Sequence, residues 1–388
     1  MIRITDKATC SGCHACAAAC PENCITMVQD DEGFLYPAVD GSKCKNCAVC
    51  TKICPILSPL GSDRTESPTA YAAFSKDGAV RLNSSSGGVF THLASEVIKA
   101  GGVVVGAAFD EAFAVRHICI ETADDLWKLR GSKYLQSTVG NSFAETKRFL
   151  ESGRTVYYSG TPCQIAGLLK FLKKNYDNLI TQDIICHGVP SPKVWNCYLH
   201  HRENAAKSKV KEISFRDKKS GWTTFSIDFI FENHMEFARR FAEDAYMKAF
   251  LANLSLRPSC YRCSFKGLAR PADITLADFW GIQQVVPEMD DNKGTSLVFL
   301  HSEKGKDIFR RIEKDIVYQP VSAEKAVRYN SAAVQAVNLP SKRKTFMQSV
   351  SEGNFETVTD KMARTPMVRK VLRKTKTVIQ HFTGRKGR

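Results

Sequence analysis

From residue 69 onward, short apolar runs alternate with amphipathic stretches, which is the rhythm of strands and helices. Val103–Phe109 is long enough for a buried strand, and Gly101-Gly102 before it ends a helix that begins near Val89. The expected strands lie at 71–74, 103–109, 155–158, 179–185, 213–215, 223–231, 273–278 and 296–300, and the expected helices at 89–100, 142–152 and 160–174. This order predicts a mixed α/β sheet followed by antiparallel strands.

Residues 1–57 follow a different pattern because they contain an internal repeat. The segment Cys10-Ser-Gly-Cys-His-Ala-Cys-Ala-Ala-Ala-Cys-Pro21 recurs 34 positions later as Cys44-Lys-Asn-Cys-Ala-Val-Cys-Thr-Lys-Ile-Cys-Pro55. The residues between the two copies, 25–39, alternate around Asp31-Glu-Gly33 and predict a short hairpin. The polar, Pro- and Ser-rich segment 58–68 predicts a linker.

The chain of 388 residues contains 15 cysteines, and we expect it to be cytoplasmic. Its longest apolar stretch falls well short of the ~18 residues that span a bilayer, and the first cysteine motif precedes any apolar signal-peptide core. In a reducing compartment, so many cysteines favour metal or redox chemistry over a disulfide framework. Hydrophobic residues at 43% and charged residues at 24% exclude a mainly disordered chain, a collagen and a coiled coil.

The repeated spacing C-x2-C-x2-C-x3-C-P is the pattern of bacterial ferredoxins with two 4Fe–4S clusters. Three close cysteines wrap one cluster, and the fourth reaches the other. The predicted ligands are Cys10, Cys13, Cys16 and Cys54 for one cluster, and Cys44, Cys47, Cys50 and Cys20 for the second. Zinc sites usually use two C-x2-C pairs, so zinc is the weaker alternative. Cys24, Cys119 and Cys197 lie outside the pattern and are expected to be packed thiols.

Four further cysteines stand in the body of the chain. Cys163 and Cys186 follow two successive predicted strands, whose carboxyl ends form the usual ligand-binding edge of an α/β sheet. Cys260 and Cys263 form a C-x2-C pair. Together these four thiols predict a third 4Fe–4S cluster, although zinc would accept the same set, and Cys163 and Cys186 could instead be buried small residues.

Two polar loops are candidates for binding an anion. Ser84-Ser-Ser-Gly-Gly88 precedes a helix, where backbone amides can receive a phosphate, although a serine cap with turn glycines explains the same residues. The second loop, Gly131-Ser-Lys-Tyr-Leu-Gln-Ser137, contains a lysine cation and an aromatic ring that could also contact an anionic ligand.

In combination these segments resemble a known family. The matching residues are Ser-Ser-Ser-Gly-Gly-Val-Phe-Thr (84–91), Gly-Ser-Lys-Tyr-Leu-Gln-Ser (131–137), Gly-Thr-Pro-Cys-Gln-Ile-Ala-Gly-Leu (160–168), Cys-His-Gly-Val-Pro-Ser-Pro (186–192), Cys-Tyr-Arg-Cys (260–263), Ala-Asp-Phe-Trp-Gly (277–281) and Lys-Gly-Thr-Ser (293–296). The chain resembles the coenzyme F420-reducing hydrogenase/dehydrogenase beta subunits over about residues 1–300, with a ferredoxin module fused in front.

The resemblance implies FAD and a 4Fe–4S cluster in the body. It implies flavin contacts from Ser86, Gly87, Gly88, Lys133, Gln136 and Ser137, and backbone contacts from Gly160 and Thr161. His187 and Asp278 adjoin the implied site and are candidate catalytic proton carriers, with structural hydrogen bonding as the alternative. The implied fold class is α+β: a small bacterial-ferredoxin-like domain, a mixed α/β flavin-binding domain and a basic helical tail.

The expected domains are a two-cluster ferredoxin domain (1–57), a linker (58–68), an FAD and iron–sulfur domain (69–340) and a basic amphipathic helical tail (341–388). The net charge of +15 is concentrated in that tail, where 13 Lys/Arg oppose 3 Asp/Glu. Residues 361–388 contain ten Lys/Arg and no acid, which suits an anionic inner-membrane face or an acidic partner, or else a packed helix with a solvated face. Nucleic acid is not expected, because no reader motif is present.

These features predict an iron–sulfur flavoprotein oxidoreductase. Electrons would pass between a donor ferredoxin or other redox protein and a small-molecule hydride acceptor, with coenzyme F420 as one candidate. The alternative is an electron-transfer subunit of a larger complex without substrate chemistry of its own, a class that includes proteins associated with polysaccharide synthesis. The third hypothesis is a structural adaptor protein that binds zinc.

Overall fold

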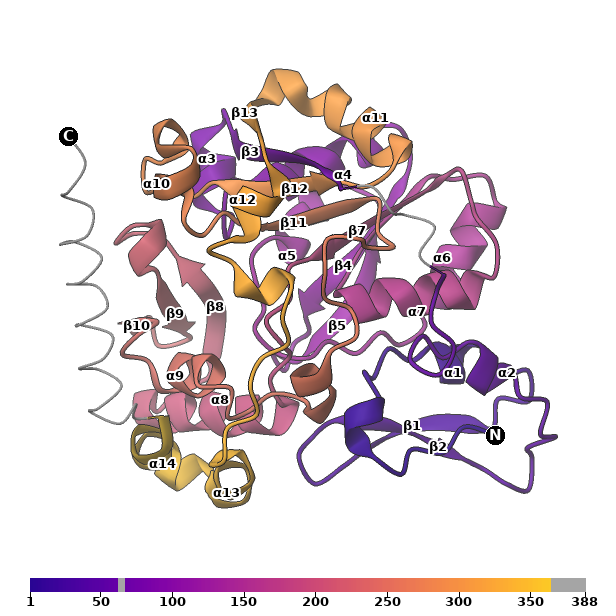
Figure 1. Ribbon diagram of the computed structural model, residues 1–388. Helices are drawn as coiled ribbons and strands as arrows, with labels where there is room; N and C mark the ends of the chain where they lie inside the picture. Colours follow the sequence, from indigo (N-terminus) through magenta and orange to yellow (C-terminus); the bar gives the residue numbers. More distant parts are fainter. Residues whose placement is uncertain (62–66, 364–388) are drawn as a thin grey trace, which may run out of the picture.

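The computed structural model describes residues 1–61 and 67–363, and its N-terminal unit is small (Figure 1). Strands β1 (Ile25–Gln29) and β2 (Leu35–Val39) pair antiparallel, which confirms the predicted hairpin. The short helices α1 (Ala15–Ala18) and α2 (Val49–Lys52) lie one in each copy of the repeat. His14 and Ala48, at equivalent positions of the repeat, both adopt left-handed backbone conformations before these helices, so sequence repetition becomes structural repetition.

The body is built on an eight-stranded mixed sheet in the order β13-β3-β12-β11-β7-β6-β4-β5. Its strands are β3 (Thr69–Ser75), β4 (Val103–Phe109), β5 (Val115–Ile120), β6 (Val156–Ser159), β7 (Leu179–Ile184), β11 (Ile274–Asp278), β12 (Ser296–Leu300) and β13 (Ile316–Val321). The central strands β4, β6, β7 and β11 are mutually parallel, and the outer pairings are antiparallel. The carboxyl ends of the parallel strands therefore share one edge.

Successive residues of β4 show how the sheet is covered, because side chains alternate between the two faces of a strand. Val104 packs in one core with α4 (Val89–Lys99) and α11 (Glu303–Ile312). Val103 and Val105 pack in another with α6 (Ser142–Glu151) and α7 (Pro162–Leu172). This second core also includes Cys13 and Ala15, so the N-terminal unit is continuous with the body.

A smaller antiparallel sheet of order β10-β9-β8 forms a second layer beside the main sheet (Figure 1). Its strands are β8 (Val210–Asp217), β9 (Ser226–Phe231) and β10 (Glu236–Arg240). They share an aromatic-rich core with α8 (Pro192–Ala206), α9 (Ala245–Leu251), α13 (Arg343–Ser349) and α14 (Phe355–Ala363). The remaining helices are α3 (Gly78–Leu82), α5 (Leu126–Leu129), α10 (Ile282–Val285) and α12 (Ala323–Val327).

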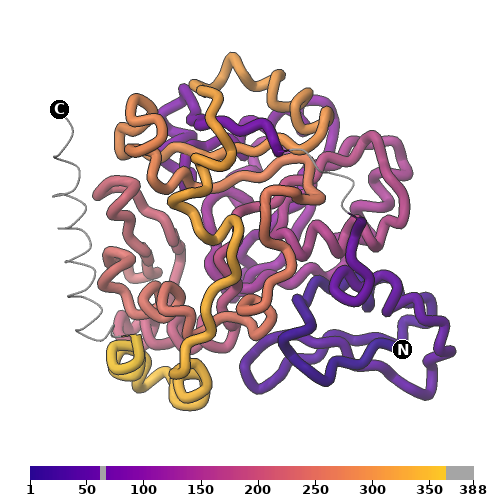
Figure 2. Tube along the Cα trace, in the orientation of Figure 1, coloured from indigo at the N-terminus to yellow at the C-terminus, as the bar shows by residue number. Residues whose placement is uncertain are grey.

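The C-terminal part of the described chain runs from the main sheet to the opposite end of the molecule, where it reaches α13 and α14 (Figure 2). There Arg343 forms a two-pronged ion pair with Glu32 of the β1–β2 turn, at 2.6 and 2.8 Å. Lys193 of α8 donates to the carbonyl of Asp31, and the hydroxyl of Ser191 donates to that of Glu32. The hairpin is thus held by two separate elements of the body.

The predicted elements occur close to their expected places, with one clear error. The expected strand 223–231 begins only at Ser226, because the Thr223 backbone amide and hydroxyl donate to Asn292 and a 3-10 turn, Trp222–Thr224, forms instead. Among the longer elements, the sequence pattern did not predict β5, β10, β13, α8, α9 or α11. In the described part of the predicted tail, α13 and α14 are helical, whereas residues 364–388 lie outside the described residues.

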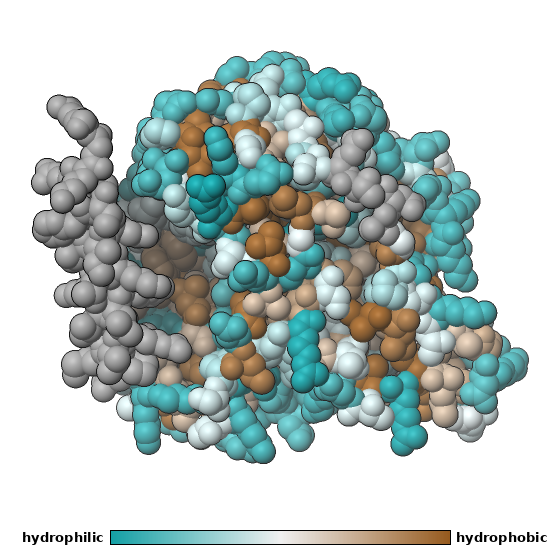
Figure 3. Space-filling view, viewed as in Figure 1, coloured by the Kyte–Doolittle hydropathy of each residue, from teal (hydrophilic) through white to brown (hydrophobic). Residues whose placement is uncertain are grey.

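The face seen in Figure 3 is hydrophilic around much of its margin, with apolar side chains gathered nearer its centre. Within residues 1–61 and 67–363, no helix is both long and apolar enough to cross a bilayer.

Candidate redox site

Two small pockets in the N-terminal unit gather the cysteines of the repeat in the predicted sets. Cys10, Cys13, Cys16 and Cys54 line one pocket with Ile2, Ile4 and Met27. Cys20, Cys44, Cys47 and Cys50 line the other, together with Cys24. The fourth cysteine of each copy therefore faces the pocket of the other copy, as the ligand exchange of two-cluster ferredoxins requires. The donor chemistry of both sets fits 4Fe–4S clusters.

Cys24 is buried, as expected for a packed thiol, but its sulfur lies 3.3 Å from that of Cys20. The hydrogen bond with Cys20, followed by burial, raises the pKa of Cys24 to about 12. Cys24 is thus a neutral neighbour of the second pocket.

The four body cysteines come from three elements and meet near the carboxyl edge of the parallel strands. Cys163 is in the first turn of α7, directly after β6, and Cys186 follows β7. Cys260 lies in the 3-10 turn Pro258–Arg262, and Cys263 caps it. Burial, together with the neighbouring thiols of the same set, raises the pKa of Cys163, Cys186 and Cys260 to about 12. The four thiols of this set have the donor chemistry that the predicted third cluster would need.

Hydrogen bonds hold these loops in place. The Thr161 hydroxyl lies 3.2 Å from the sulfur of Cys163, and the Val189 amide donates to that of Cys260 at 3.4 Å. Lys266 donates to the Cys186 carbonyl at 2.5 Å. Across the described chain, no three His, Cys, Asp or Glu side chains form a site for a single metal ion.

Cys13 joins the N-terminal unit to the body. A β-carbon on Gly167 of α7 would lie 3.0 Å from the Cys13 β-carbon and 3.1 Å from its sulfur, so α7 needs glycine at this contact. Cys13 and Cys163 also interact electrostatically. The first pocket of the N-terminal unit therefore lies beside the four-cysteine site of the body.

The two polar loops predicted to contact flavin also meet. The Ser85 hydroxyl accepts hydrogen bonds from the amide (2.6 Å) and hydroxyl (2.8 Å) of Ser132. Gly87 is buried against β3, where a β-carbon would lie 2.3 Å from the Ala73 carbonyl oxygen, and Gly88 caps α4 with φ +87°. The Ser86 hydroxyl donates to the Thr295 carbonyl and its own carbonyl accepts from Lys218.

Buried cations surround this pair of loops. Partial burial lowers the pKa of Lys133 to about 7, and its ammonium group donates to the carbonyls of Arg130 and Gly131. Burial, followed by the charges of Arg216 and Arg81, lowers the pKa of Lys218 to about 8. Such a concentration of positive charge suits a phosphate-bearing ligand.

The remaining predicted flavin residues lead toward Cys163. Ser137 bonds to His117 (3.2 Å) and receives a hydrogen bond from Gln164 (2.9 Å), while Thr161 and Gln164 form a capping box at the start of α7. Gly160 lies beside both Gln164 and His117. Gln136 instead faces the N-terminal unit, where its amide donates to the Ser11 carbonyl.

Both predicted catalytic residues have structural partners. Asp278, at the end of β11, forms a two-pronged ion pair with Arg216 and accepts a hydrogen bond from Trp222. His187 hydrogen-bonds to Asn253 at 2.7 Å and packs against Phe250. Burial lowers the pKa of His187.

Sequence reasoning missed several residues of this region, namely His117, Gln164, Arg216, Lys218 and Arg257. Gln164 and Arg257 lie inside or next to the quoted motifs, so their places in the sequence could have identified them as candidate site residues. The other three are isolated polar residues in ordinary strands or their ends, and only the fold brings them here.

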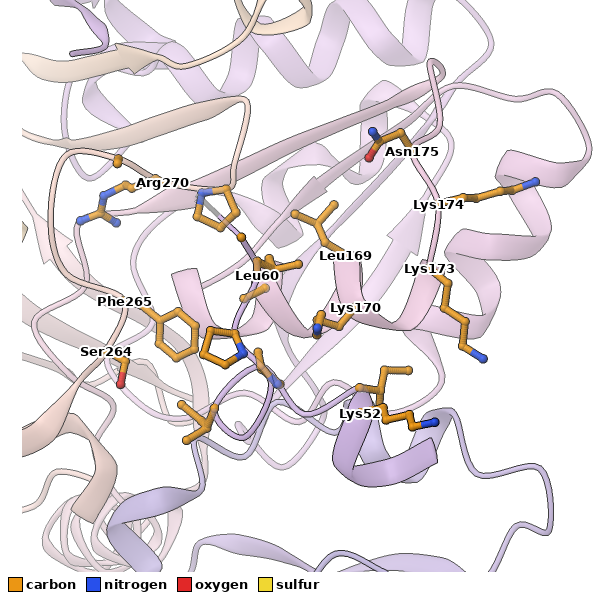
Figure 4. Close-up of a pocket in the computed structure, with 18 of the residues that line it drawn as sticks. Lys52, Leu60, Leu169, Lys170, Lys173, Lys174, Asn175, Ser264, Phe265 and Arg270 are labelled. Atoms are coloured by element: carbon orange, nitrogen blue, oxygen red, sulfur yellow. The ribbon is translucent and has the colours of Figure 1, made fainter. Parts of the chain in front are cut away.

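A cavity of about 890 Å³ opens between the N-terminal unit, α7 and the loop 264–271 (Figure 4). Leu60, Leu169 and Phe265 give it an apolar lining, and the lysines around it are Lys52, Lys170, Lys173, Lys174 and Lys266. Within the described chain, no Asp or Glu lines it. Ile53 and Pro55 flank Cys54, and Ser264 follows Cys263, so the cavity wall adjoins two cysteine sites.

Comparison with known proteins agrees with this arrangement. The family models for the N- and C-terminal parts of the coenzyme F420 hydrogenase/dehydrogenase beta subunit match residues 70–143 and 153–325, which together make up most of the chain. The chain belongs to this family. A 4Fe-4S dicluster domain model matches residues 9–56, which supports iron–sulfur binding by the ferredoxin-like unit. Family membership supports the predicted oxidoreductase class.

Three individual proteins are similar over parts of the chain. A coenzyme F420-dependent sulfite reductase of Methanocaldococcus jannaschii is 28% identical over 174 residues, which are 43% of this chain and 26% of that protein. An uncharacterized ferredoxin of the same organism is 36% identical over 52 residues, 13% of this chain and 66% of its own. A solved chain of the F420-reducing [NiFe] hydrogenase complex from Methanosarcina barkeri aligns with TM-score 0.47 and 17% identity, covering 70% of this chain and 93% of that one.

Proposed function

We propose that the protein is an iron–sulfur flavoprotein oxidoreductase that passes electrons between a ferredoxin-type donor and an organic hydride acceptor such as coenzyme F420. When bound, 4Fe–4S clusters supply single-electron transfer and FAD supplies two-electron hydride chemistry. Family membership and the dicluster match support the iron–sulfur electron-transfer part of this proposal.

The observation that carries the proposal is the serial order of three cysteine sets. Cys20, Cys44, Cys47 and Cys50 line the outer pocket, Cys10, Cys13, Cys16 and Cys54 line the next, and the body cysteines lie beyond the Cys13–Gly167 contact. Thr161 contacts Cys163 and donates a hydrogen bond to Gln164, which in turn donates to Ser137. A contiguous row of this kind suits sequential electron transfer into a flavin site.

The FAD part of the proposal rests on the two polar loops. Ser86, Gly87 and Gly88 lie at the N-terminus of an eleven-residue helix, which favours an anionic group. Lys133 and Lys218 add positive charge nearby, so we propose the flavin diphosphate at this end and the ring near Gly160 and Thr161.

The donor is proposed to dock at the lysine-lined cavity. Redox proteins with acidic surfaces complement a basic rim, and charge of this kind chiefly raises the rate of association. The lining residues next to Cys54 and Cys263 would bring such a donor close to two of the cysteine sites.

One observation favours the alternative, an electron-transfer subunit without substrate chemistry. Asp278 and His187 are both held by structural partners, so neither presents a free proton-transfer group. Under this alternative the isolated chain binds clusters but turns over no small molecule.

Anaerobic isolation with metal and flavin analysis tests the proposal. Three occupied sites should give about 12 iron atoms per chain, together with one FAD. About eight iron atoms with one zinc would refute the third cluster. A chain that retains iron but never binds added FAD would support the electron-transfer alternative.

The basic segment 361–388 remains a predicted contact for an acidic partner or an anionic membrane face, and residues 364–388 lie outside the described residues. Binding to anionic liposomes that persists after deletion of 361–388 would contradict the membrane version.

A further inference from the structure

Arg257 is a fully buried arginine between two of the cysteine sites. It is 0% exposed and stands three residues before Cys260 and six before Cys263. Its Nε donates to the Cys10 carbonyl (2.8 Å), one Nη to Gln136 (2.9 Å) and the other to the Leu35 carbonyl (2.9 Å). The guanidinium lies 4.3 Å from the centre of the Tyr36 ring. All of these partners are neutral.

The other buried arginines of the described chain have anionic partners. Their ion pairs are Arg81 with Asp291, Arg202 with Glu356, Arg216 with Asp278, Arg270 with Asp183 and Arg343 with Glu32. The hydrogen-bond partners of Arg257 among the described residues include no carboxylate. Removing a charge from water without a counter-ion is unfavourable even after relaxation, so an uncompensated buried guanidinium needs an explanation.

The groups near Arg257 that can become anionic are thiols of both cysteine sets. One Nη lies 3.7 Å from the Cys10 sulfur, which belongs to the first pocket. On the other side, Arg257 caps the turn Pro258–Arg262, and its carbonyl accepts a hydrogen bond from the Cys260 amide at 2.9 Å. Arg257 also interacts electrostatically with Cys163 and Cys260 of the body site. A β-carbon on Gly12 would lie 2.7 Å from Nη1 of Arg257, so the loop carrying Cys10 and Cys13 is shaped around the guanidinium.

We propose that Arg257 is the shared counter-ion of the two adjacent cluster sites, Cys10/Cys13/Cys16/Cys54 and Cys163/Cys186/Cys260/Cys263, and that it raises the reduction potential of both. This inference rests on the proposed function. Each one-electron reduction by the donor adds one negative charge to a site, and a fixed positive charge stabilises the reduced form more than the oxidised form. Arg257 is a positioning and tuning residue, because its effect acts through the sulfur ligands.

The test uses the full-length chain, reconstituted anaerobically, with potentials measured by redox titration and electron paramagnetic resonance. Arg257→Gln removes the charge and should lower the midpoint potentials of two clusters, leaving the Cys20/Cys44/Cys47/Cys50 cluster nearly unchanged. Arg257→Lys keeps the charge and should stay closer to the wild type. Unchanged potentials in an iron-replete Arg257→Gln protein would overturn the inference.

Two controls separate charge from structure. Arg262→Gln removes an exposed arginine of the same turn, whose charge is screened by solvent and paired with Asp6, so it should shift the potentials much less than Arg257→Gln does. Glu32→Gln weakens the pairing of the hairpin with Arg343 without touching Arg257. If Glu32→Gln shifts the potentials as much as Arg257→Gln, loosened packing is the cause and the counter-ion role is wrong.

Iron content keeps this test distinct from that of the proposed function. A wild-type chain that never acquires iron contradicts the proposed function itself, whereas iron-replete proteins with identical potentials contradict only the role of Arg257. If Arg257→Gln does not fold, Arg257→Lys decides: a large fall in both potentials despite the retained charge would overturn the inference, and retained potentials would support it.

Discussion

At the scale of single residues, each cysteine of a set is expected to be a ligand of one 4Fe–4S cluster. Cys163→Ser removes one ligand of the body site, so iron should fall from about 12 to about 8 per chain while the N-terminal sets keep theirs. Cys197→Ser is the matched control, because Cys197 lies on α8 and belongs to none of the three cysteine sets. Metal analysis decides this, and equal iron loss in both variants would contradict the assignment.

Lys133 offers a pH test of the proposed flavin site. Partial burial lowers its pKa to about 7 in the free protein, so below pH 7 the lysine already carries the charge that would attract a diphosphate. Above pH 7, binding an anion requires proton uptake, so FAD affinity should fall with rising pH until the higher pKa of the bound state is reached.

Fluorescence titration of FAD from pH 6 to 9 measures this dependence. Lys133→Met should bind FAD more weakly and lose most of the pH dependence. Lys128→Met, which removes a lysine paired with Asp125, should behave like the wild type. A pH profile that is the same in Lys133→Met and wild type would contradict the role of Lys133.

At the scale of elements, the packing of α7 on the N-terminal unit depends on Gly167. Gly167→Val adds atoms where a single β-carbon already lies 3.0 Å from Cys13, and overpacking of this kind costs about 1–3 kcal/mol. We expect a lower thermal unfolding midpoint and faster proteolytic release of the N-terminal unit. Gly78→Val, in a helix where a β-carbon meets nothing within 4 Å, should change the midpoint less. If Gly167→Val and Gly78→Val lowered the unfolding midpoint equally, the Cys13–Gly167 contact would not explain the loss of stability.

The elements also show what the sequence could predict. Cysteine spacing and strand–helix alternation are local patterns, so the sequence could predict which cysteines line each pocket of the N-terminal unit and where most central strands lie. The turn at Trp222–Thr224 depends on Asn292, nearly seventy residues away, and Arg257 acquires its importance only when Cys10 is packed against it. Interactions between distant segments leave no periodic signal in the chain.

At the scale of the whole molecule, the lysine-lined cavity predicts an electrostatically steered donor. A double variant, Lys52→Glu with Lys173→Glu, should slow reduction by an acidic donor ferredoxin at low salt by about tenfold or more and weaken the salt dependence. Stopped-flow reduction at several ionic strengths measures both effects. Lys99→Glu, on α4 away from the cavity, is the control. A double variant as fast as the control would place the donor elsewhere.

The contacts between the body and the β1–β2 turn bear on whether the fused ferredoxin-like unit moves during electron transfer. Arg343 and Lys193 hold Glu32 and Asp31 from two different elements, while Gly167 and Arg257 contact the unit near Cys13 and Cys10. A unit fixed at several separate points is a stationary relay rather than a tethered shuttle. Its internal electron-transfer rate should therefore be insensitive to solvent viscosity and to a lengthened 58–68 linker.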